Sequence, residues 1–187
     1  MKRIIEVFIV LLAIVIASEP CQAQSCSDRA MWVWYLPLEN QKAVKDFFEF
    51  CKSPHGNPDN NISRIFFCCR SEPESNDFQG LLNSENEIKL LKKFIKECTK
   101  SGIIIDVLDA SNDYSAINKR VHKILNYNRK VLPEERFHGF NFDIEFFEKD
   151  MAAYKNFLRS LRAKIDNYNE DTKQDIKIGT VIARHWI

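Results

Sequence analysis

Apolar residues along the chain gather in two alternating kinds of segment. Five short runs, rich in apolar and aromatic residues, have the length of strands: 31–36, 62–69, 103–108, 137–146 and 176–182. Helices are predicted between them at 40–51, 84–100, about 112–129 and about 150–167. The first two helices repeat apolar residues on one face, and Ser84 with Glu87 forms a capping-box signature at the start of the second. The pattern predicts five strands that alternate with four helices.

Alternation of strands with helices is typical of parallel βα units, and the run 103–108 is apolar on both faces, as buried parallel strands are. Successive strands start about 36 residues apart, a spacing that suits a TIM barrel of about 250 residues or more. We therefore expect an α/β fold, a partial (β/α)8 TIM barrel with about five parallel strands and four helices. A complete doubly wound sheet with strand order 2-1-3-4-5 is the alternative.

The N-terminus has the composition of a targeting segment. Lys2 and Arg3 precede an apolar run at 7–17, which is shorter than the roughly 20 residues that span a bilayer. A signal peptide over residues 1–23 is predicted, with cleavage after Ala23 or after Ala17. An uncleaved membrane anchor is the other interpretation, and the length of the run argues against it. Residues 24–187 would then form the N-terminal part of one exported barrel domain, periplasmic or extracellular, with no stable membrane span.

Composition narrows the class of protein further. The chain has 187 residues, a formal net charge of +1, 45% hydrophobic residues, 5 glycines and 6 prolines. It is too apolar for a disordered chain and too poor in glycine and proline for a fibrous one. The near-neutral charge gives no reason to expect nucleic acid as a partner. Because the glycines are scattered and form no phosphate-binding loop, no cofactor is expected.

The cysteines leave two interpretations open. Export permits disulfides, and cleavage after residue 23 leaves an odd number of cysteines, at positions 26, 51, 68, 69 and 98. Several of them are equally well explained as small buried residues. Cys68 and Cys69 are adjacent in a predicted strand, so their side chains should point to opposite faces. No Cys/His cluster has the spacing of metal ligands, and no metal site is predicted.

The predicted strand at 137–146 carries the candidate chemistry. Its alternation sends aromatic and aliphatic residues to one face and Asn141, Asp143 and Glu145 to the other. Polar side chains at such positions are costly to bury unless they are hydrogen-bonded or used. Glu145 lies at the carboxyl end of the strand, where βα barrels hold their active sites, and the charge of Asp143 should raise its pKa. Glu145 is therefore a candidate general acid, the alternative being that both carboxylates only bond to loop backbone at the rim.

This strand resembles the fourth-strand signature of family 18 glycoside hydrolases, Asp-x-Asp-x-Glu. Asn141 occupies the first position, and Asp143 and Glu145 match the other two. In those chitinase-like enzymes the acetamido group of the substrate is the nucleophile, whereas in other retaining barrels a second carboxylate from a later strand lies about 5–5.5 Å from the acid.

A closer resemblance is to bacterial glycoside-hydrolase-like barrel proteins. These begin with a Met-Trp-Val-Trp strand, here at 31–34, and carry Gly-x-x-x-Asp-[Ile/Val]-Glu, here at 139–145. Their third strand ends in an Asp-containing turn, like the one with Asp109, and their fifth strand ends in an aromatic residue, like Trp186. The resemblance runs over about 31–186. It implies a hydrolase-like barrel with Glu145 as acid/base and Asp143 supporting it.

The candidates for substrate binding are Asn141, Trp32, Trp34, Asp109 and Trp186. The three tryptophans can stack on sugar rings, although alternating aromatic residues on a strand more often form core. Asp109 would face the mouth of the barrel or, as the alternative, cap the following helix.

We expect an exported protein that acts on or binds carbohydrate, with Glu145 as general acid/base. A non-catalytic carbohydrate- or envelope-binding protein is the alternative, as is an inactive gene fragment, because five βα units make only part of an eight-unit barrel. Such a chain would be truncated after the fifth strand. The edges of the first and fifth strands would then allow self-association.

Overall fold

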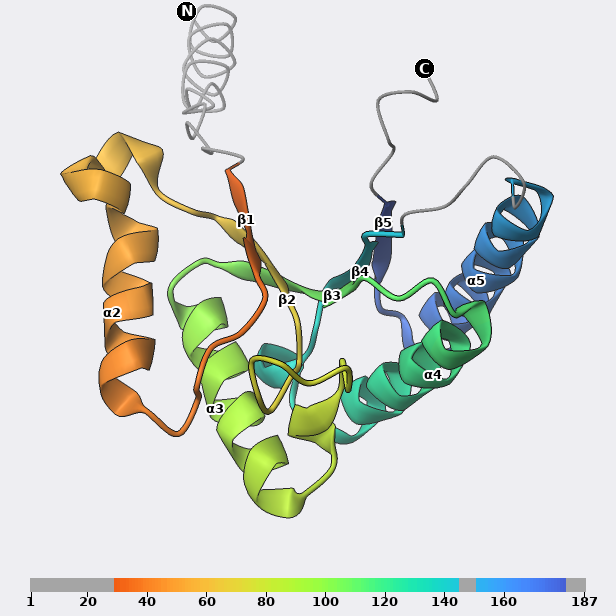
Figure 1. Cartoon of the computed structure of the whole chain (residues 1–187), viewed down its shortest axis with the longest axis horizontal. Helices are drawn as coiled ribbons and strands as arrows, with labels where there is room; N and C mark the ends of the chain where they lie inside the picture. Colours follow the sequence, from red (N-terminus) through yellow and green to blue (C-terminus); the bar gives the residue numbers. More distant parts are fainter. Residues whose placement is uncertain (1–28, 145–150, 181–187) are drawn as a thin grey trace, which may run out of the picture.

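The computed structural model describes residues 29–144 and 151–180, which form an α/β fold (Figure 1). In chain order the strands and α-helices are β1 (Ala30–Val33), α2 (Gln41–Lys52), β2 (Arg64–Phe67), α3 (Glu85–Lys100), β3 (Ile104–Asp109), α4 (Tyr114–Lys130), β4 (Gly139–Phe142), α5 (Met151–Thr172) and β5 (Lys177–Thr180). Short 3-10 turns lie in the connections: η1 (Pro54–Gly56), η2 (Pro58–Asn60), η3 (Gly80–Leu82) and η4 (Pro133–Glu135). All five predicted strands and all four predicted helices are present.

The predicted signal peptide, residues 1–23, lies outside the described residues. Within the described ranges, none of the helices combines the length and the apolar composition that crossing a bilayer requires.

Side-chain caps start α2, α3 and α4. Asn40 accepts hydrogen bonds from the backbone amides of α2, and the Ser84 hydroxyl accepts one from the Glu87 amide at 3.2 Å. The Ser84 hydroxyl also donates to the Glu87 carboxylate at 2.7 Å, so the pairing predicted from the sequence is present. In α4 the cap is Asp113, which accepts from the Ala116 amide at 3.0 Å. The prediction that Asp109 caps this helix is therefore wrong.

The end of α3 is set by a Schellman motif. Gly102 has a φ of 70°, the left-handed conformation that glycine adopts without strain. Its amide donates to Thr99 at 3.1 Å, and the amide of Ile103 donates to Cys98 at 2.9 Å. The turn therefore directs the chain from α3 straight into β3.

The five strands are parallel and adjacent in the order β1-β2-β3-β4-β5. This order excludes the doubly wound alternative, in which the first strand would lie between the second and the third. Parallel connections are almost always right-handed, so a sheet that adds strands in one direction keeps its helices on one side. Figure 1 shows the four helices along one side of the sheet.

Three contacts identify the face that the helices cover. Phe67 of β2 packs on Phe94 of α3 with ring centroids 5.0 Å apart, and Phe142 of β4 packs on Phe157 of α5 at 6.1 Å. The Thr180 hydroxyl of β5 lies 2.6 Å from the Tyr154 hydroxyl of α5. These strand residues belong to one set of alternating positions, and the apolar core lies between them and the helices.

The cysteines that the structure describes are buried free thiols, at positions 51, 68, 69 and 98. For these four, the interpretation as small buried residues is correct. Three belong to the core beneath the helices, and Cys68 lies outside that cluster, in agreement with opposite faces for Cys68 and Cys69. Burial raises the pKa of the Cys51 thiol to about 11, so this thiol is protonated near neutral pH.

One buried asparagine, Asn128, and one half-buried asparagine, Asn169, tie the ends of helices to the strands that follow. The Asn128 side chain of α4 accepts from the Phe137 amide at 3.0 Å and donates to the Phe137 carbonyl at 2.8 Å, just before β4. Asn169 of α5 bonds to the amide and carbonyl of Ile176 at 2.9 and 3.1 Å, just before β5. The same device therefore positions two successive strands.

Replacing Asn128 should destabilise the fold strongly. The variant Asn128→Ala leaves a buried amide and a buried carbonyl without partners, at a cost of about 2–4 kcal/mol in the free energy of unfolding. Urea denaturation measures this loss. Asn156→Ala on the exposed surface of α5 is the matched control and should change the free energy by less than about 0.5 kcal/mol. Equal effects of the two substitutions would contradict the role of Asn128.

Candidate functional site

The candidate site lies on the face of the sheet that the described helices do not cover, here called the second face. One row of residues in register crosses all five strands on this face: Trp32, Phe66, Asp106, Gly139 and Lys177. Asn141 lies two residues beyond Gly139, on the same face. Aromatic residues at β1 and β2 and polar residues at β3 and β4 therefore share one surface.

Trp32 and Trp34 are both exposed, with 45% and 38% of their surface accessible to solvent. Their rings pack edge to face with centroids 6.3 Å apart. Within the described residues, neither tryptophan belongs to the apolar core beneath the helices. Exposed indole faces are surfaces on which the apolar face of a sugar ring can stack.

Asp106 lies at the centre of the second face and is only 3% exposed. One carboxylate oxygen pairs with the Arg64 guanidinium of β2, whereas Oδ1 has no hydrogen-bond partner. Glycine at position 139 permits this arrangement, because a Cβ there would lie 2.8 Å from Asp106 Oδ1. Burial raises the pKa of the Asp106 carboxyl, and the opposing effect of Arg64 is smaller.

Asn141 is 8% exposed, and its side-chain oxygen has no hydrogen-bond partner. Its side-chain nitrogen lies against Gly179 of β5, where a Cβ would come within 2.9 Å. The predicted separation of strand faces is confirmed for Asn141, since Phe140 and Phe142 belong to the apolar core. Asp143, two residues further on, is half-buried, and its amide donates to the Asp109 carbonyl at 3.0 Å.

Asp109 lies on the helix-covered face, in register with Phe142, and is buried. Its carboxylate accepts two hydrogen bonds from the Arg120 guanidinium of α4, at 2.5 and 2.8 Å, and one from the Ser111 amide at 3.1 Å. These contacts join β3 to α4. The expectation that Asp109 faces the mouth of the site is therefore wrong.

Glu145, the predicted general acid, and Trp186 lie outside the described residues. Among the predicted site residues, the structure therefore places Trp32 and Asn141 on the second face, with Trp34 directly after β1 and Asp143 directly after β4.

A cluster at the carboxyl end of β2 escaped the sequence analysis. The Arg70 guanidinium lies 5.9 Å from the centre of the Trp34 ring and 4.5 Å from that of Phe78, within cation–π range of both. Arg120 lies 5.3 Å from Phe78 on the same cluster. The one signal in the sequence that could have indicated this cluster is Arg70, which directly follows the predicted strand 62–69. Phe78 gives no such signal, because it belongs to a polar loop without periodicity.

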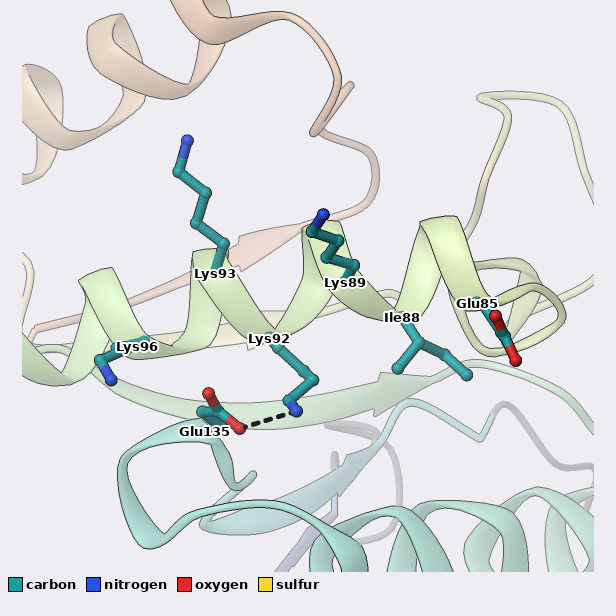
Figure 2. Close-up of a pocket in the computed structure, with 7 residues that line it drawn as sticks. All are labelled: Glu85, Ile88, Lys89, Lys92, Lys93, Lys96 and Glu135. Carbon is teal, nitrogen blue, oxygen red and sulfur yellow. Dashed lines mark ion pairs between the residues drawn. The ribbon is translucent and has the colours of Figure 1, made fainter.

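A hollow of about 470 Å³ lies elsewhere, on the exposed surface of α3 (Figure 2). It is lined by Glu85, Ile88, Lys89, Lys92, Lys93, Lys96 and Glu135. Lys92 pairs with Glu135 at 3.2 Å. None of the predicted site residues lines this hollow, and its lysines form a charged, solvated helix surface.

No group of three or more metal-ligating side chains occurs in the described ranges 29–144 and 151–180. Compared with models of known protein families, with curated proteins and with solved structures, the chain matches none.

The raised pKa of Asp106 predicts a pH dependence of stability. The folded state holds this proton more tightly than the unfolded state, so the contribution of Asp106 to stability falls as the pH rises above 3.8. Asp106→Asn removes this effect. The free energy of unfolding of the variant minus that of the wild type should therefore increase between about pH 4 and pH 7.

Urea denaturation at a series of pH values measures this difference. Asp166→Asn, at an exposed position on α5, is the matched control and should not show the same rise. A flat or falling difference for Asp106→Asn would show that burial does not govern this carboxyl.

Proposed function

We propose that the sheet is part of a (β/α)8 barrel of the glycoside-hydrolase-like type. The parallel strands in consecutive order and the helices on one side support this proposal, because a βα barrel has the same local arrangement. In such a barrel the second face of the sheet is the interior, and the carboxyl ends of the strands surround the site.

We propose further that this site acts on carbohydrate. The observation that carries the proposal is the exposed pair of tryptophans, Trp32 and Trp34. Trp32 shares a face with the buried polar side chains of Asp106 and Asn141, and the ring of Trp34 packs against that of Trp32. A pyranose ring presents apolar C–H groups on its faces and hydroxyl groups around its edge. It therefore fits a surface on which indole rings adjoin hydrogen-bonding groups.

In this proposal Glu145 is the general acid/base, and Asp143 supports it. Glu145 lies two residues beyond Asp143 in the sequence, so the alternation of the predicted strand 137–146 would send both side chains to the same face. A carboxylate neighbour raises the pKa of a glutamic acid, which is what proton donation to a glycosidic oxygen requires. The proposed signal peptide places this activity in the periplasm or outside the cell.

Non-catalytic carbohydrate binding is the second candidate function. Position 141 carries a neutral asparagine, and its side-chain oxygen has no partner in the structure. An amide at this position can bind a sugar hydroxyl but cannot supply the charge of a third carboxylate.

Removal of the proposed general acid should abolish turnover. In Glu145→Gln, the rate of hydrolysis of chito-, cello- or xylo-oligosaccharides should fall by about 10²–10⁴-fold, because the amide cannot donate the proton. Release of reducing ends measures the rate, and Glu170→Gln on the exposed surface of α5 is the control. Equal rates for Glu145→Gln and wild type would exclude the assignment, and glycan binding without hydrolysis by the wild type would favour the second candidate.

The stacking surface has its own test. Trp32→Ala should weaken glycan binding by about three- to tenfold, since it removes an exposed ring that is not part of the apolar core beneath the helices. Isothermal titration calorimetry with an oligosaccharide that the wild type binds gives the affinity. Phe50→Ala on α2, where 40% of the side chain is exposed, should leave the affinity unchanged. An unchanged affinity in Trp32→Ala would remove Trp32 from the binding surface.

A further inference from the structure

Arg70 lies where a ligand of the second face would be bound. It follows the last residue of β2 by three positions and therefore lies at the carboxyl end of the sheet, the end at which parallel αβ folds bind ligands. Its guanidinium is close to Trp34, one of the two exposed tryptophans of the proposed carbohydrate surface.

The positive charge of Arg70 has no carboxylate partner within the part of the chain that the structure describes. Among the described residues, the Arg70 guanidinium donates one hydrogen bond, a long one of 3.4 Å, to the Pro73 carbonyl. Nε is buried and has no hydrogen-bond partner. Glu72 and Glu74 follow in the chain, but both are exposed and neither forms an ion pair with Arg70.

Arg120 provides a comparison within the same cluster. Both arginines lie close to the Phe78 ring, but Arg120 is neutralised by the two hydrogen bonds to Asp109. The Cys68 thiol does not balance the positive charge of Arg70. Burial raises the pKa of this thiol to about 11 even in the presence of both guanidinium groups, so the thiol is uncharged near neutral pH. The cluster therefore carries one uncompensated positive charge, on Arg70.

A guanidinium with a buried, unpaired N–H group is unfavourable unless an acceptor binds to it, and planar oxyanions match its forked geometry. The guanidinium lies over the Trp34 ring, with its carbon 5.9 Å from the indole centre, so a sugar ring that contacts Trp34 beside the guanidinium would hold its substituents close to Arg70. We propose that Arg70 binds the acidic substituent of an anionic carbohydrate, a carboxylate or a sulfate, at the carboxyl end of β2. This inference rests on the proposed carbohydrate function.

Paired oligosaccharides that differ only in charge test the inference. Oligogalacturonate and its methyl ester compare a carboxylate with a neutral group. Carrageenan oligosaccharides and their desulfated forms make the same comparison for a sulfate, and chito- and cello-oligosaccharides are neutral references. Affinities are measured by calorimetry for the full chain, for Arg70→Gln, for Arg70→Lys and for Arg159→Gln. Arg159 is an exposed arginine on α5, so its variant controls for the loss of one charge.

The wild type should bind at least one acidic oligosaccharide about tenfold or more tightly than its neutral counterpart. Arg70→Gln should lose this preference, and Arg159→Gln should keep it. Arg70→Lys retains the charge without the forked donor geometry, so it should weaken binding by about threefold or more. If thermal denaturation shows that Arg70→Gln does not fold, the affinity of Arg70→Lys for the acidic oligosaccharide decides whether Arg70 binds the acidic substituent. The acidic oligosaccharide that is bound identifies the substituent as carboxylate or sulfate.

Two outcomes would overturn the role of Arg70 and leave the proposed function standing. One is binding of neutral oligosaccharides without any preference for acidic ones. The other is an acidic preference that persists in the folded Arg70 variants. If the wild type binds none of the oligosaccharides in the panel, the carbohydrate function and this inference are overturned together.

Discussion

Packing of one face of the parallel sheet against α3, α4 and α5 is the constraint on which the other features depend. Side chains alternate along a strand. Burying Phe67 and Phe142 beneath the helices therefore sends the preceding residue of each strand, Phe66 and Asn141, to the second face. A shift of one residue would move Asp106 and Asn141 under the helices, where unpaired polar groups are costly. The aromatic and polar residues of the second face are therefore positioned by an apolar core to which they do not belong.

Strand β3 shows how this constraint distributes charge. Asp106 and Asp109 are three residues apart and lie on opposite faces, and each is buried against an arginine of another element. A buried carboxylate is tolerated when an opposite charge lies next to it, so each pair also fixes the position of a neighbouring element. Arg70 is the exception within this arrangement, because aromatic rings surround its guanidinium without neutralising it.

Much of the fold was predictable from local pattern. The periodicity located the five described strands and the four α-helices, and the Ser84–Glu87 pairing located the start of α3, because these signals act within a few residues. The candidate site was predictable only in part. Alternation placed Asn141 on the second face, but the sequence assigned Asp109 to the mouth of the site, because its partner Arg120 lies on another element.

The sequence by itself determined the alternation of strands and helices and, through the two-residue period of each strand, which side chains share a face. Only the tertiary structure decided the order of the strands and the pairs that depend on it. Trp34 and Arg70, or Asn128 and Phe137, meet because the chain brings separate elements together. Short-range periodicity describes one segment at a time and carries no information about which residue of another segment will lie opposite.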